Sequence, residues 1–130
     1  MNPEQIQNIA ELGTLVSFTV GQEIYQEDFL VNDPAAFFVL EGQVEVVKKY
    51  TPLQKEVFEI GKGDIFGTLE IYTGTPRLTT ATAKTDVQAV AFGKDDLEKA
   101  MSNNLNFALT SIRQLSKTLR QINARIKKLA

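Results

Sequence analysis

The sequence predicts a mainly β domain that ends in one long helix. Short apolar or alternating stretches recur every 8–12 residues or so and are separated by Gly, Pro, Asn and Asp, which is typical of antiparallel barrels and sandwiches. From residue 105 onward the apolar residues follow a helical period, with neither Gly nor Pro among them. A chain of 130 residues is long enough for one buried core, so we expect one domain over residues 1–130.

Local patterns predict the elements in order. Pro3 and Gly13 suit the first turn and the end of a short helix over residues 3–12. Strands are expected at residues 15–20, 23–26, 36–41, 43–50, 57–60, 78–82 and 87–92, and a short helix at 95–101. We therefore expect an N-terminal helix within residues 1–13, a β-domain over 14–93 and helices over 94–130.

The composition excludes several classes of chemistry. The chain has no histidine and no cysteine, so the commonest general base, thiol nucleophiles and the usual ligands of zinc, iron and haem are missing. A cupin, which is another small β-barrel, needs histidines for its metal. No nucleophile–base pair is visible either, so we expect no metal site, no catalytic residues and no enzyme.

The start of the sequence, its apolar runs and its charged residues do not indicate a membrane or nucleic-acid partner. The sequence has no apolar run near 20 residues and no signal-like start, which favours a cytoplasmic protein. All 16 acidic residues precede Lys99, whereas half of the 14 basic residues lie at or after it. This basic end is either an interaction surface or the solvent-facing side of a helix near its negative end.

The last helix carries an apolar seam, which we define as Leu105, Ala108, Ile112, Leu115, Leu119, Ile122, Ile126 and Leu129. Their alternating spacing of three and four is an a/d heptad pattern. A helix of this length, about 40 Å, is longer than a small barrel can cover. The seam either lies flat on the barrel or pairs with a second copy. Its two-position width favours a homodimer through residues 105–129.

Residues 61–83 form a glycine-rich segment that suits a phosphate. Gly61, Gly63 and Gly67 allow close backbone approach, and a short helix start presents N–H groups to an anion. Arg77 follows a Gly-Thr-Pro turn and offers the planar fork of donors that phosphate oxygens favour.

This segment resembles the phosphate-binding cassette of cyclic-nucleotide-binding domains of the catabolite activator protein type. The matching residues are Phe66, Gly67, Leu69, Gly74, Pro76, Arg77 and Ala83, with Gly21, Gly42 and residues 61–64 at the family's spacing. The resemblance implies a double-stranded β-helix, or jelly roll, with a short N-terminal helix and a long C-terminal dimerisation helix. It also implies cytoplasmic signal transduction and transcription regulation.

The resemblance implies a ligand site made of Phe66, Gly67, Thr68, Leu69, Arg77, Leu78, Thr79 and Asn123. The ligand would be a cyclic nucleotide or a related small phosphorylated molecule. Two positions depart from the family: Thr68 stands where a glutamate accepts a hydrogen bond from the ribose, and Leu78 where Ser, Thr or Ala is usual. A gapless count from Arg77 puts the base-contacting pair of the last helix at Ile122 and Asn123, of which only Asn123 can hydrogen-bond.

Two functions follow as hypotheses. The first is a non-enzymatic regulatory sensor that binds the phosphorylated ligand at Arg77. The alternative is a dimerisation or interaction module of the same fold that has lost the nucleotide, with Arg77 paired to a carboxylate of the protein, for which Glu70 is nearest in sequence. A DNA-reading role would need a helix-turn-helix domain, as in longer family members, of which this chain would then be the sensor part.

Overall fold

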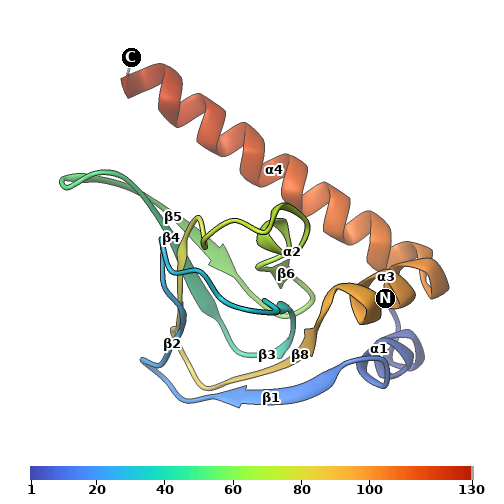
Figure 1. The fold of residues 1–130 in the computed structure, drawn as a ribbon. Helices are drawn as coiled ribbons and strands as arrows, with labels where there is room; N and C mark the ends of the chain where they lie inside the picture. Colours follow the sequence, from blue (N-terminus) through green and yellow to red (C-terminus); the bar gives the residue numbers. More distant parts are fainter. Residues whose placement is uncertain (130) are drawn as a thin grey trace.

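The computed structural model describes residues 1–129 and confirms the predicted roll of antiparallel strands flanked by helices (Figure 1). One sheet has the order β1-β8-β3-β6 and the other β2-β7-β4-β5. The strands are β1 (Thr14–Phe18), β2 (Glu23–Tyr25), β3 (Ala36–Glu41), β4 (Val44–Thr51), β5 (Gln54–Ile60), β6 (Ile65–Phe66), β7 (Thr80–Ala83) and β8 (Val87–Phe92). The helices are α1 (Pro3–Ala10), α2 (Leu69–Thr73), α3 (Lys94–Asn103) and α4 (Leu105–Leu129).

The core lies between the two sheets and continues beneath the helices. Val39, Val44 and Ala89 are fully buried inside the roll, where the alternation of the strands directs them. A second cluster at one end packs α1, α3 and the first turn of α4 on the roll through residues such as Ile9, Leu97 and Phe107. The Phe107 ring meets Phe38 edge-on at 5.3 Å between centroids.

The strand pattern of the sequence located the sheets well but missed β6. This strand has two residues, Ile65 and Phe66, paired with Phe38 and Phe37 of β3. Two residues are too few to show a period, so only the pairing partner reveals them. Gly42 makes the turn between β3 and β4 with φ +94°, where a Cβ would lie 2.2 Å from the Asp86 carbonyl oxygen.

Helix α4 runs along one side of the roll, from α3 toward the side of the β4–β5 hairpin (Figure 1). Asn104 caps it, because its Oδ1 accepts a hydrogen bond from the Phe107 N–H at 2.9 Å. The stripe that faces the roll overlaps the apolar seam at Ile122 but is otherwise distinct from it. Its main residues are Phe107, Ser111, Gln114, Thr118, Ile122 and Arg125, which are buried or half-buried. Most of the seam remains exposed on another face of the helix.

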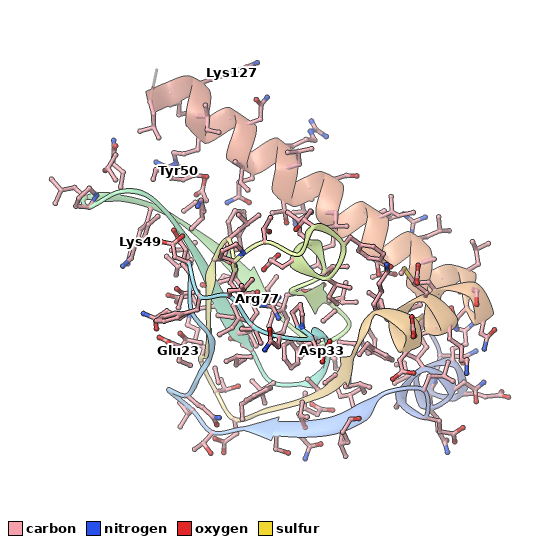
Figure 2. All side chains as sticks on the ribbon, in the orientation of Figure 1. Glu23, Asp33, Lys49, Tyr50, Arg77 and Lys127 are labelled. Carbon is pink, nitrogen blue, oxygen red and sulfur yellow. The ribbon has the colours of Figure 1, made fainter. Side chains whose placement is uncertain are left out.

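The far end of α4 is held to the roll by an ion pair. The Arg125 guanidinium donates to both carboxylate oxygens of Glu56 on β5, at 3.3 and 3.2 Å. These hydrogen bonds lower the pKa of Glu56 below its usual range. Lys127, in the last turn of α4, points away from the roll (Figure 2). The remaining basic residues of α4 are exposed, in agreement with the solvent-facing alternative.

Across residues 1–129, every helix is too short or too polar to cross a lipid bilayer.

Candidate functional site

The segment expected to bind phosphate forms a compact unit beside the roll. The chain leaves β6, turns at Gly67 with φ +79°, forms the single turn of α2 and reverses at Gly74 in the left-handed conformation. Arg77 then returns toward the roll, where its backbone N–H donates to the Phe29 carbonyl at 3.0 Å and its carbonyl accepts from the Asp28 N–H at 2.8 Å. These two bonds fix where the arginine side chain starts.

The Arg77 side chain is buried and directed into the protein (Figure 2), with only 3% of its surface exposed. Its Nη1 donates to the Glu70 carboxylate at 3.2 Å and to the Gly67 carbonyl at 2.9 Å, and its Nη2 donates to the Ala35 carbonyl at 2.7 Å. Glu70 is 4% exposed, so both charges are removed from water. The anion that Arg77 needs is therefore supplied by the protein itself.

The guanidinium also lies over the ring of Tyr25, with Cζ 4.1 Å from the ring centroid. An aromatic face attracts a cation, so the ring adds to the stabilisation that the carboxylate and carbonyls provide. Burial raises the pKa of the Tyr25 hydroxyl to about 12, so the phenol stays neutral at any physiological pH.

Gly67 is required by this arrangement in two ways. Its positive φ is costly for any residue with a side chain, and a Cβ there would lie 3.0 Å from Arg77 Nη1 and 3.2 Å from the Ala35 carbonyl oxygen. The glycine therefore lets the backbone approach the guanidinium and accept its hydrogen bond. In this structure the group that approaches the Gly67 backbone is the guanidinium of Arg77.

A cavity of about 290 Å³ lies between this unit, the roll and α4. Six of the eight expected ligand-contacting residues line it: Phe66, Gly67, Thr68, Leu69, Leu78 and Thr79. Arg77 does not line the cavity, whereas its partners Tyr25, Gly67 and Glu70 do. The arginine therefore lies behind the wall that these three residues form.

Asn123 is also outside the cavity. It is exposed, and the neighbouring Ile122 lines the cavity in its place. A count of residues from Arg77 cannot predict how α4 is rotated against the roll, and that rotation decides which of the two faces inward. The hydrogen-bonding side chains of α4 that line the cavity are those of Gln114 and Thr118.

Sequence reasoning placed Asn123 of the last helix at the site but did not identify Gln114 and Thr118, which line the cavity. Gln114 and Thr118 are spaced by four residues, and Gln114 Oε1 accepts a hydrogen bond from the Ile65 N–H at 2.7 Å. The signal was present as a second stripe of small and polar residues beside the seam. A helix that packs on the roll and also carries an apolar seam needs two stripes, one for each contact.

Removing the Glu70 carboxylate leaves the Arg77 charge buried without its counterion. We expect Glu70→Ala to lower the free energy of unfolding by about 3–5 kcal/mol. Urea unfolding of both proteins measures this change. The control is Glu41→Ala, whose carboxylate pairs with Lys62 at 3.4 Å on the surface, each side chain about two-thirds exposed. The control variant should differ from the wild type by less than about 1 kcal/mol. An equal cost for the two variants would contradict the buried pair.

Comparison with known proteins identifies the family and the fold. A family model described as "Cyclic nucleotide-binding domain" matches residues 15–104. A "CRP-like cAMP-activated global transcriptional regulator" of Mycobacterium tuberculosis is 26% identical over 111 residues, which are 83% of this chain and 48% of that protein. The chain thus spans about half the length of the curated relatives it matches.

Solved structures show the same fold. The catabolite activator protein of Thermus thermophilus superposes with a TM-score of 0.77 at 19% identity, over 99% of this chain and 60% of that one. The c-di-GMP responsive global regulator CLP of Xanthomonas campestris gives 0.79 at 14% identity, over 98% and 64%. The fold, the spacing of the glycine-rich segment and the match over most of the roll agree, and the chain belongs to the family of cyclic nucleotide-binding domains.

Proposed function

We propose that this chain is a non-enzymatic regulatory domain that senses a small molecule in the cytoplasm and passes the signal through α4. One observation carries the proposal: the cavity and the apolar seam share residues. Leu115 and Ile122 belong to the seam and also line the cavity. A molecule that fills the cavity therefore contacts the helix whose other face is available to a second copy.

The exposure of the seam supports pairing of two copies through α4. Ile112, Leu119 and Ile126 are 58%, 68% and 51% exposed, although apolar side chains at heptad spacing favour burial. Helix α4 packs on the roll through its other stripe, so these side chains are exposed to solvent. A partner helix would bury each of them with a stabilisation of about 1.5–3 kcal/mol before association costs.

A charge in the middle of the seam should abolish this pairing. Leu119→Glu would place a carboxylate in the apolar interface without a partner, so we expect a folded monomer, whereas the wild type is a dimer at tens of micromolar. Sedimentation velocity measures both states. Arg120→Glu is the control, because this residue is exposed and lies outside the seam; that variant should remain dimeric. A monomeric wild type, or a dimeric Leu119→Glu, would refute pairing through α4.

The relatives suggest a cyclic nucleotide as the sensed molecule, but two features of the site weaken that ligand here. Thr68 lacks the carboxylate that the family uses for the ribose, and Glu70 already occupies Arg77 at 3.2 Å. A phosphate would have to displace Glu70 and bury it as an unpaired charge. The Glu70 contact also favours the second candidate function, a dimerising module of this fold that has lost nucleotide binding.

The same two features predict how nucleotide binding can be strengthened. Thr68→Glu combined with Glu70→Ala returns a carboxylate toward the sugar and frees Arg77 for phosphate. Because a hydrogen bond to a charged group contributes about 1.5–3 kcal/mol, we expect cyclic AMP affinity to rise by roughly 10- to 100-fold. Calorimetry with cyclic AMP and cyclic GMP measures the change.

Arg77→Met in the same double variant is the matched control and should remove the gain. If the wild type binds cyclic AMP as tightly as the double variant, Glu70 does not obstruct the phosphate. The nucleotide would then be the sensed molecule, and the second candidate function would be excluded.

A further inference from the structure

We infer that the cavity between the roll and α4 takes an uncharged, largely apolar small molecule with one or two hydrogen-bonding groups, and disfavours a phosphorylated one. The inference rests on the proposed function in placing the sensed molecule in this cavity. It goes further in naming the chemistry of that molecule.

The apolar character of the wall is the first observation. The cavity lies among Val46, Phe58, Ile60, Ile65, Phe66 and Leu115, which come from both the roll and α4. At about 290 Å³ it has the size of the smaller ligand sites in proteins, which are mostly apolar with a few placed polar groups. A ligand of matching surface gains by leaving water for such a wall.

The state of the charged residues is the second observation. Two charged side chains line the cavity, Lys48 and Glu70, and each is paired within the protein. Glu70 pairs with Arg77, and Lys48 Nζ lies 3.4 Å from the Glu27 carboxylate, whose side chain is 14% exposed. An anionic ligand would therefore meet one cation at the wall, Lys48, which is already paired, and would lose its own hydration.

The remaining polar side chains at the wall, apart from Lys48 and Glu70, are the third observation, and they are uncharged. Thr68, Thr79 and Thr118 offer hydroxyl groups that can donate or accept. Gln114 has its oxygen bound to the Ile65 N–H, so the group it retains for a ligand is the donor NH₂. Hydroxyl, carbonyl or phenol groups match these partners, and they need no counterion.

One pair of small molecules isolates the effect of charge. 1-Naphthol and 1-naphthyl phosphate share the same ring system and differ in carrying a neutral hydroxyl or an anionic phosphate at pH 7. Calorimetry on the full chain should give at least ten-fold tighter binding of 1-naphthol. In Glu70→Ala, where Arg77 lacks its internal partner, the preference should shift toward the phosphate.

Two variants locate the binding. Thr118→Phe adds a ring inside the cavity and should weaken 1-naphthol binding at least ten-fold. Ser116→Phe adds the same ring to an exposed position of α4 and should leave binding unchanged. Tighter binding of 1-naphthyl phosphate to the wild type, binding of neither compound, or equal binding by wild type and Thr118→Phe would each overturn the inference.

Failure of the proposed function gives a different result. In that case 1-naphthol would bind with the expected preference, and Thr118→Phe would lose it. The dimer dissociation constant from sedimentation would nevertheless be the same with and without 1-naphthol, because the cavity would not communicate with α4.

Discussion

The buried positive charge of Arg77 is the constraint on which the site depends. A guanidinium that is 3% exposed needs an anion and several acceptors, and Glu70, Gly67 and Ala35 provide them. This requirement fixes α2, which carries Glu70, against the roll. The position of α2 in turn sets one wall of the cavity. The same bonds that hold Arg77 therefore also shape the cavity.

Helix α4 connects this site to the surface of the molecule because one of its faces packs on the roll and another is exposed to solvent. One face lies on the roll, with Gln114 bound to Ile65 and Arg125 bound to Glu56. The apolar seam lies beside it and is largely exposed. Leu115 and Ile122 belong to the seam and also line the cavity, so the proposed signal would need no long path through the protein.

The sequence predicted the fold and the family well because both depend on local signals. Strand alternation, glycines at turns and the spacing from Phe66 to Arg77 are all visible in one dimension. Strand β6 was missed, since its two residues are defined by pairing with β3. Asn123, expected at the ligand, lies outside the cavity of one chain, and counting residues cannot give the rotation of α4. The packing of α4 instead places Ile122 at the cavity.

The partner of Arg77 was the question that the sequence left open. Phosphate and Glu70 were both compatible with the pattern, and in the structure Glu70 is the partner. Gly67 and Arg77, ten residues apart, would be present whether Arg77 bound phosphate or Glu70. The distance of 3.2 Å between the arginine and the carboxylate depends on three-dimensional packing that no spacing rule contains.

A double-mutant cycle between Arg77 and Glu70 tests the central claim most directly. Unfolding free energies of the wild type, Arg77→Met, Glu70→Leu and the double variant give the coupling between the two side chains. An internal pair predicts a coupling of about 2 kcal/mol or more and a double variant at least as stable as either single one. Additive costs, within about 0.5 kcal/mol, would mean that Arg77 does not depend on Glu70 and is left for a ligand.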